Sequence, residues 1–503
     1  MATQCPEGKI KRQEVIIKDL RSENKVLKNK LYNIERQVQT RSSKCKKYKT
    51  ELLSLRQENK VNGKEVKSLK KNLLVYKKMG LSEDKPKYHS YPTWIMRTAI
   101  ILQVSQGLSY RQVQEVLRTI LCIMCLTMSV PCPNTIRQWV QKYSKNELKK
   151  GEENEESKIL VIDESIGMGQ EKAFLILGVD AEDWAENPRS LKHEDTKVTG
   201  LQSKKSWKGP QIAATIKRVR GTVKYIVSDN GSVLKKACEL ADIVRVPDCT
   251  HYMGNLLKKH STQSKSVQTL FTKMSKIRQQ WGQTEYAPLI TPNMRTKSKF
   301  LNMYAIVDWV KIILANWDNL DEKHQTKVSF LKEDEVCLQE LICLVNTIKD
   351  LSELFKNKGI TEQTCTEIQA IFAKKCTNYA ALEKLKIDII DYVEKIRASL
   401  PNESCILCCS DVIESYFGKY KNRNEKKASQ GITQDILVAS LFGADFCVDE
   451  LKEAMESTSW ADVNAWSKEN LVPSMGEEKR NFWRKVSSKL PNTPLKNTEV
   501  CTG

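Results

Sequence analysis

The order of strand-like and helix-like segments between residues 158 and 247 constrains the fold of this chain more than any other feature. Apolar runs with β-type composition occur at 158–163, 172–180, 197–201, 222–228 and 242–246, the third being the weakest. Helical patterns occupy 210–220, before the fourth run, and 231–241, after it. Three strands, a helix, a strand, a helix and a strand predict an α/β domain with a mixed sheet.

Acidic residues follow two of these predicted strands. The order of elements is that of a ribonuclease H-like fold, in which the first and fourth strands are neighbours, so Asp163 and Asp229 should lie close together. A third carboxylate, Glu414, lies on a predicted helix. Converging carboxylates are the ligands that two Mg²⁺ (or Mn²⁺) ions need for phosphodiester chemistry. Taken singly, each Asp also fits a turn or a helix cap, and Glu414 fits a solvated helix face.

The predicted sheet occupies only part of the chain. With 503 residues, the chain exceeds the roughly 250–300 residues at which a single core stops growing. We predict a ribonuclease H-like catalytic core with a large all-α insertion, preceded by a helical domain and a coiled coil. The boundaries follow in order: 1–80 coiled coil, 81–150 helical domain, 151–260 first part of the core, 261–400 helical insertion, 401–445 last part of the core with the Glu414 helix, and 446–503 C-terminal helical segment and flexible tail.

Residues 81–150 have the pattern of a helix-turn-helix module. Gly107 ends one predicted helix, and Ser109 and Gln112 form a capping box that opens the next. A further helix begins after Pro133. This arrangement fits a unit that reads a major groove, and it also fits a small helical bundle that makes no DNA contacts. Candidate DNA-binding residues on the polar side of the last helix are Arg137, Gln138 and Lys142.

Residues 10–79 follow one heptad register and carry most of the net charge. Residues 1–80 hold 22 Lys and Arg against 8 Asp and Glu, a net +14 of the total +21. Leucine-type residues at d positions and an Asn at an a position, such as Asn24, favour a parallel dimer, while Asn59, Asn62 and Gly63 weaken the seam near its middle. The excess positive charge suggests a polyanionic partner. The alternatives are a single long helix packed on the body and a solvated basic face.

Three segments resemble those that carry the catalytic acids of the DDE transposases of the ribonuclease H-like superfamily: VIDES for the first Asp, IVSDNG for the second, and SDVIESYFGKYK for the Glu. The sequence DCTH, from Asp248 to His251, resembles the C/D(2)H motif of Mutator-like elements and related transposases. The resemblance covers residues 156–260 and 405–445, together with the general position of the helical insertion.

The resemblance implies a DNA transposase that binds transposon ends and performs metal-dependent strand cleavage and strand transfer. Asp163, Asp229 and Glu414 would be the metal ligands and catalytic acids. Asp248 and His251 would form an accessory site that orders the strand edge or touches DNA; a helix cap with a satisfied histidine is the alternative. Candidate phosphate contacts on the Glu414 helix, which equally fit a solvated basic helix end, are Lys419, Lys421 and Arg423.

Two other classes of function remain open from the sequence: a transposase-derived DNA-binding protein without catalysis, and a ribonuclease H-like nuclease or resolvase. The expected partners of a transposase are double-stranded DNA, as terminal inverted repeats and target, and a second copy of the chain. We predict no membrane partner, because no apolar run approaches the roughly 20 residues needed to span a bilayer. We expect an intracellular protein, located in the nucleus if eukaryotic and otherwise in the cytoplasm or nucleoid.

The sixteen cysteines are scattered and favour reduced, largely buried thiols. Cys122 and Cys125 have metal-type spacing inside an apolar run, which favours core positions. The CILCC segment, with Cys405, Cys408 and Cys409, is compatible both with buried small side chains and with zinc or redox chemistry.

Overall fold

The chain forms two compact units, residues 1–83 and 84–503. The computed structural model describes residues 14–37, 39, 84–123, 128–165, 171–261, 265–292, 299–374, 379–424, 431–473 and 475–487. The predicted coil beyond residue 39, which includes the basic sequence KCKKYK at 44–49, therefore lies outside the described residues, as do Cys125 and the polar tail. Cys122, for which we expected a core position, is exposed at the end of its helix. Among the described helices, none is both long and apolar enough to cross a membrane.

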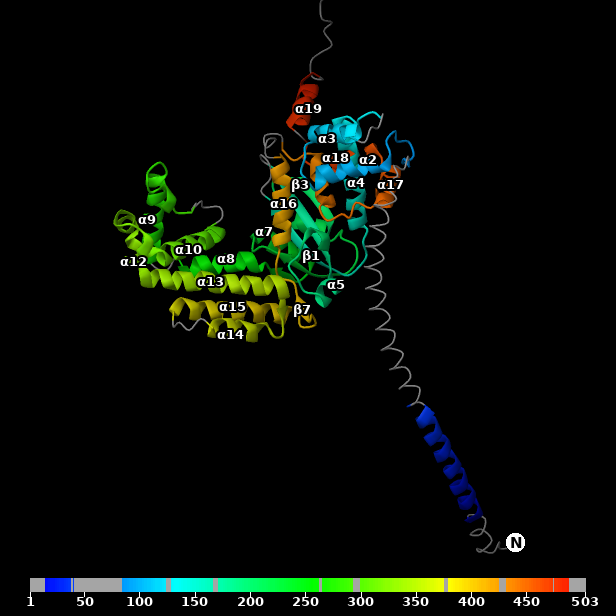
Figure 1. Cartoon of the computed structure of the whole chain (residues 1–503). Helices are drawn as coiled ribbons and strands as arrows, with labels where there is room; N and C mark the ends of the chain where they lie inside the picture. The colour runs from blue at the N-terminus through cyan, green and yellow to red at the C-terminus, as the bar shows by residue number, and fades with distance from the viewer. Residues whose placement is uncertain are drawn as a thin grey trace, which may run out of the picture. The chain divides into compact units, whose positions relative to one another are not determined.

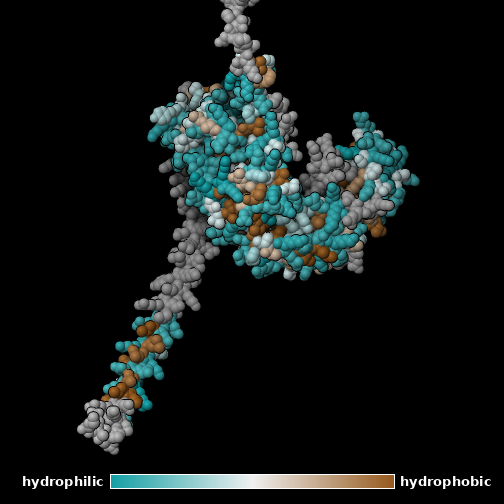
Figure 2. Space-filling model, turned by 180° about the vertical axis from the view of Figure 1, so that it is seen from behind, coloured by the Kyte–Doolittle hydropathy of each residue, from teal (hydrophilic) through white to brown (hydrophobic). Residues whose placement is uncertain are grey.

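In the first unit, residues 14–37 form a helix with an exposed apolar stripe (Figure 2). The predicted seam side chains leave about half or more of their surface exposed in the single chain, from 48% for Ile17 to 62% for Leu27. Burying such a stripe against a second helix is the main driving force of a coiled coil. The dimer itself stays a prediction.

Deleting residues 1–80 should convert a dimer into a monomer, because the exposed seam of 14–37 would be lost. Light scattering should give the mass of two chains for the full-length protein and the mass of one chain for the truncated protein. A matched variant, Leu27→Asp, places a charge in the seam and should also weaken the dimer. An unchanged number of chains per particle in both variants would contradict the coiled-coil interpretation.

The second unit contains a five-stranded mixed sheet in the order β3-β2-β1-β4-β5 (Figure 1). Strand β1 pairs antiparallel with β2 and parallel with β4; β2 pairs antiparallel with β3, and β4 parallel with β5. The predicted order of strands and helices is confirmed. The strands are β1 (Lys158–Ser165), β2 (Lys172–Asp180), β3 (Thr196–Lys204), β4 (Val223–Ser228) and β5 (Arg245–Pro247).

Strand β5 is shorter than the sequence pattern suggested. Helix α7 (Ser232–Ala241) ends at Asp242, which has a φ of 59° in the left-handed region. The next two residues lead the chain back to the sheet, so that pairing with β4 begins only when Arg245 is reached. The apolar run at 242–246 is therefore partly a helix-to-strand connection.

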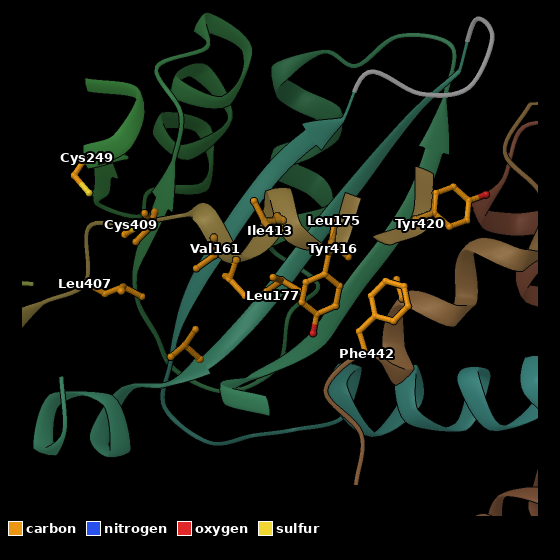
Figure 3. Packing of buried hydrophobic residues seen from close by; sticks show 14 of the residues in the cluster. Val161, Leu175, Leu177, Cys249, Leu407, Cys409, Ile413, Tyr416, Tyr420 and Phe442 are labelled. Atoms are coloured by element: carbon orange, nitrogen blue, oxygen red, sulfur yellow. The ribbon is translucent and has the colours of Figure 1, made fainter. Parts of the chain in front are cut away.

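Alternating side chains divide the sheet into two faces. Leu160 and Ile162 of β1 belong to a core cluster with α6 (Gly209–Ile216) and α7. Ile159 and Val161 belong to the larger cluster on the opposite face. Helix α16 (Asp411–Asn424) lies across this second face, as Figure 3 shows.

The helices that precede the sheet pack into the same compact unit as the sheet. They are α2 (Thr93–Val104), α3 (Tyr110–Ile123) and α4 (Pro133–Glu152). The predicted capping box is present: Ser109 N donates to Gln112 Oε1 at 2.9 Å, and Gln112 N donates to Ser109 Oγ at 3.3 Å. Helix α4 ends against β3, where a Cβ on Gly151 would lie only 2.0 Å from the carbonyl oxygen of Val198. Only glycine fits this approach.

Between β5 and α16 the chain is almost wholly helical, as predicted. A two-stranded sheet pairs β6 (Ile360–Thr361) with β7 (Cys405–Ile406) and connects this region to the segment before α16. The helices are α8 (Cys249–Ser261), α9 (Lys265–Trp281), α10 (Lys299–Ala315), α11 (Glu322–Val328), α12 (Phe330–Glu333), α13 (Glu335–Lys358), α14 (Thr364–Ala373) and α15 (Ala380–Ser399), with 3-10 turns η2 (Ala287–Leu289) and η4 (Trp317–Asn319).

The chain after α16 is also helical. Here the structure contains η6 (Gln434–Leu441), α17 (Val448–Ser457), α18 (Trp460–Asn470) and α19 (Met475–Ser487). Two short elements complete the sheet domain between β2 and β3: α5 (Ala181–Glu186) and η1 (His193–Asp195). Contacts with α2 and α4 bring α17 and η6 back to the helices that precede the sheet.

Candidate functional site

Asp163 and Asp229 lie at the same edge of the sheet. In the parallel pair of β1 and β4, Ile162 is opposite Ser228, so the two aspartates come next on adjacent strands. Asp163 is also opposite Leu175, whose side chain belongs to the core cluster on the α16 face. Because side chains alternate, both carboxylates belong to the face that α16 covers. The predicted neighbourhood of these two strands is confirmed.

The Asp229 side chain is held by a tight turn. Its Oδ1 accepts a hydrogen bond from Gly231 N at 2.8 Å. Arg245 Nη1 donates to the Asp229 carbonyl oxygen at 2.9 Å. The turn chemistry that the sequence suggested for Asp-Asn-Gly is thus present. The turn uses only Oδ1 of Asp229. It therefore does not prevent Oδ2 from binding a ligand at this end of the sheet.

Asp248 connects the end of β5 to the segment before α16. This buried carboxylate accepts from His251 N at 2.7 Å and lies 2.8 Å from His251 Nδ1, both through Oδ2. Its Oδ1 accepts from Ser410 N at 2.6 Å. Asp248 therefore caps the helix and is a hydrogen-bond partner of His251, as the alternative interpretation of the sequence suggested. These contacts belong to a wider network that reaches α16.

His251 continues this network to Glu414, with 3.5 Å between His251 Nε2 and Glu414 Oε1. Glu414 lies in the first turn of α16, and its side chain is 56% exposed. The opposite side of the helix is buried, with Ile413 and Tyr416 packed over the sheet (Figure 3). This packing fixes which side of α16 carries Glu414.

The first turn of α16 also contacts the helical insertion. Lys356, near the end of α13, forms an ion pair with Asp411. Sequence reasoning did not find this pair, because Lys356 belongs to no motif and 55 positions separate it from Asp411. Burial is the main cause that raises the pKa of Glu414. The positive charge of Lys356 opposes part of this rise.

These acidic groups form one electrostatic site. Burial, followed by the negative charge of Asp229, raises the pKa of Asp163 to about 7. The charge of Glu414 raises it further, and that of His251 opposes the rise. The hydrogen bond to Asp248 is the main cause that raises the pKa of His251 to about 9. A charged His251 therefore partly compensates a cluster of carboxylates that repel one another.

The donor chemistry of the site suits a divalent cation. Asp163, Asp229 and Glu414 offer hard oxygen ligands, and the repulsion that raises the Asp163 pKa is what a cation relieves. Among the described residues, however, the donor atoms of these three carboxylates do not all lie within 4.8 Å of one another. The group that meets that distance consists of Asp248, Cys249 and Cys409.

The predicted DNA-binding residues of the helix-turn-helix region contact the protein itself. Arg137 Nε lies 3.2 Å from Asp435 Oδ1. Lys142 Nζ donates to the Met455 carbonyl oxygen at 2.6 Å, and burial lowers its pKa. Gln138 is half-buried. These contacts give Arg137 and Lys142 a structural role in packing α4, and their DNA contacts stay a prediction.

On α16, Arg423 donates to the carbonyl oxygens of Gln103 and Val104 at the end of α2. Burial lowers its pKa to about 10. Lys419 is exposed, with Nζ 5.2 Å from the centre of the Phe442 ring, and Lys421 is exposed as well. Of the three, the two lysines are the side chains that this structure leaves accessible to a phosphate.

Comparison with family models and with curated proteins gives no match for this chain.

Proposed function

We propose that the protein is a DDE-type DNA transposase, which binds transposon ends and performs metal-dependent strand cleavage and strand transfer. The observation that carries the proposal is the electrostatic site formed by Asp163, Asp229 and Glu414 with His251. Three segments separated by 66 and 185 positions contribute its carboxylates. A set of acids brought together from such distances, at the carboxyl ends of parallel strands, is typical of a catalytic site.

The sheet supports a ribonuclease H-like assignment of the core. Three antiparallel strands are followed by two parallel ones, with β1 central and next to β4. In our proposal this core begins at 151, is interrupted by the insertion 261–400 and is completed by the α16 helix. The long insertion favours a transposase over a minimal nuclease.

The residues of the site have distinct roles in the proposed reaction. Asp163 and Asp229, on adjacent strands, and Glu414, on α16, would hold Mg²⁺ or Mn²⁺. When bound, two such ions activate water or a DNA 3′-hydroxyl and stabilise the leaving oxygen. The strands fix two of the carboxylates rigidly, while the packing of α16 over the sheet sets the position of the third.

His251 acts on this site through Glu414 and Asp248. Asp248 keeps it protonated near neutral pH, and its Nε2 faces Glu414 at 3.5 Å. A positive imidazolium beside the acids offsets their charge and can donate a hydrogen bond to a DNA phosphate oxygen. We assign His251 and Asp248 the accessory role that the DCTH sequence suggests.

DNA would contact the accessible lysines of α16, Lys419 and Lys421, close to Glu414. Dimerisation through the N-terminal coil would bring two such sites to the two ends of one element. The basic excess in residues 1–80 would add salt-sensitive attraction for DNA. In a eukaryotic cell the proposed activity would require the nucleus.

The direct test uses the full chain and a linear DNA that carries the inverted repeats flanking its own coding sequence. With Mg²⁺ or Mn²⁺, the transposase should cut at the repeat ends and join them to a plasmid target. Cleavage without joining would instead identify a nuclease or resolvase. Specific binding without metal-dependent cleavage would identify a non-catalytic DNA-binding protein.

Metal binding should depend on pH through Asp163. In the metal-free fold this carboxyl keeps its proton up to about pH 7, whereas in the unfolded chain it loses it near 3.8. The folded state therefore binds more protons in that window, and its stability falls as pH rises from 3.8 to about 7. Mg²⁺ competes with this proton, so the thermal shift that it causes should be larger at pH 8 than at pH 6.

Asp163→Asn is the matched variant for that measurement, because it keeps the side-chain size and removes the titrating group. It should abolish the pH dependence of the Mg²⁺ shift between 6 and 8. His251 titrates in a different window: its stabilising charge is complete below 6.5 and is lost as pH rises through about 9. An Mg²⁺ shift that is equal at both pH values in the unchanged protein would contradict the assignment.

A further inference from the structure

A second cluster of metal-ligating side chains lies where α8 begins beside the segment leading into α16. The donor atoms of Asp248, Cys249 and Cys409 all lie within 4.8 Å of one another. These residues are 0%, 0% and 8% exposed, so water has little access to them. In Figure 3, Cys249 lies on the green ribbon, and its neighbour Cys409 lies on the gold segment that precedes α16.

Asp248 retains one acceptor position for a ligand. A carboxylate offers about four lone-pair sites. Two on Oδ2 are used by His251 N and Nδ1, and one on Oδ1 is used by Ser410 N. One lone pair of Oδ1 therefore remains, on a fully buried carboxylate that has an oxygen within 4.8 Å of the Cys249 and Cys409 sulfurs. A metal ion could use it without displacing any of these hydrogen bonds.

Cys408 supplies a further thiol next to this group. Its side chain is fully buried, and its Sγ donates to the Phe355 carbonyl oxygen at 3.9 Å. Its carbonyl oxygen accepts a hydrogen bond from Cys249 N at 2.7 Å. The backbone thus already holds the start of α8 against the CILCC segment, which keeps thiols from two distant parts of the sequence together.

We propose that Asp248, Cys249 and Cys409 bind a structural Zn²⁺ ion, with Cys408 as the fourth ligand once its thiol turns away from the Phe355 carbonyl oxygen. Two or three thiolates with one carboxylate form a donor set that selects Zn²⁺ over Mg²⁺ or Ca²⁺. Metal–ligand bonds of about 2.0–2.3 Å require these atoms to move only slightly closer together. Each coordinating thiol releases its proton to solvent when its S–Zn bond forms, and the ion loses its bound water.

The ion would stabilise the link between two parts of the chain, because Asp248 and Cys249 begin α8 while Cys408 and Cys409 precede α16. It would thereby fix the position of His251 on α8 relative to Glu414 on α16. This site is separate from the proposed Mg²⁺ site in ligands and in chemistry. It does not depend on transposase activity, and zinc content can be measured without any DNA substrate.

The experiment measures zinc in the full-length protein, expressed with added zinc, purified under reducing conditions and dialysed against metal-free buffer. Mass spectrometry of the metal should give about one Zn²⁺ per chain. After replacement by Co²⁺, the visible spectrum should contain the bands of a tetrahedral ion and a thiolate-to-cobalt charge-transfer band. The double variant Cys249→Ser, Cys409→Ser should lose both signals.

The matched control is Cys238→Ser, which removes a buried thiol on the opposite face of the sheet. It should retain one zinc per chain. A measurement on the unchanged protein covers the case in which the double variant does not fold: chelation should make Cys249 and Cys409 reactive toward an alkylating reagent, as mapped on peptides.

Four results would overturn the proposal. They are a zinc-free protein after reconstitution, a double variant that keeps its zinc, alkylation of Cys249 and Cys409 that is independent of the chelator, and a Cys249–Cys409 disulfide in the reduced preparation. Loss of strand cleavage in Asp229→Asn with zinc retained would leave this inference intact. Conversely, a zinc-containing protein that cuts no DNA would refute only the proposed function.

Discussion

Replacing Asp229 with Asn should reduce metal-dependent strand cleavage at least about 100-fold, because even residues that only support metal ligands change activity by about 10–100-fold. The substitution is nearly isosteric. The amide oxygen can still accept the hydrogen bond from Gly231 N, which closes the turn at 2.8 Å in the native protein. The variant should therefore keep its fold and its affinity for inverted-repeat DNA, and lose the negative charge that a metal needs.

The control for this variant is Asp242→Asn, at the exposed end of α7 on the same domain. Asn also tolerates the left-handed backbone that Asp242 adopts. Cleavage should be measured on end-labelled repeat DNA, and binding by gel mobility shift in Ca²⁺ or without metal. Equal cleavage by Asp229→Asn and the control would refute the catalytic assignment of Asp229.

Removing the Asp435 carboxylate should destabilise the fold by about 2–4 kcal/mol, as expected when a partly buried charged partner of several donors is lost. Its Oδ1 accepts from Gln141 Nε2 at 2.8 Å and lies 3.2 Å from Arg137 Nε. Tyr110 Oη also donates to it at 3.3 Å. Asp435→Ala would leave all three donors without this acceptor between α3, α4 and η6.

Urea unfolding followed by circular dichroism would measure this effect. Asp445→Ala is the matched control, because it removes an exposed carboxylate from the same C-terminal region. Its free energy of unfolding should stay within about 0.5 kcal/mol of the native value. If Asp435→Ala behaved like the control, Asp435 would not be the residue that joins these helices.

The strand part of the site could be predicted from local patterns. Period-2 alternation and the spacing of apolar runs located β1 and β4, and the element order made them neighbours. Strand geometry then placed Asp163 and Asp229 at the same end of the two strands, because each directly follows a residue of the pair Ile162–Ser228. Glu414 needed a resemblance, since a Glu on an amphipathic helix has no local signature of catalysis.

The partners of the polar side chains could not be predicted from the sequence. Arg137, Lys142 and Arg423 lie on amphipathic helices, and their charge suggested DNA contacts. Whether such a residue meets a phosphate or a carbonyl group of its own chain depends on tertiary packing. Here the packing of α4 and α16 against the rest of the unit provides acceptors to all three.

The cysteine cluster illustrates the same limit. CILCC and DCTH are 154 or more positions apart; CILCC has the C-x2-C spacing of a zinc motif between Cys405 and Cys408, whereas DCTH holds a single cysteine. Only the packing of α8 beside the segment before α16 brings Cys249 to Cys409. The sequence thus drew attention to the CILCC segment, but it did not identify Asp248 and Cys249 as the partners of Cys409.

The short pairing of β6 with β7 means that the helical insertion is not a detachable module. Ile360 follows α13 and pairs with Ile406, and Cys405 Sγ donates to the Lys358 carbonyl oxygen at 3.0 Å. A shortened chain that joined β5 directly to α16 would lose these pairings together with Lys356. A chain shortened in this way would thus lose the contacts that position the helix carrying Glu414.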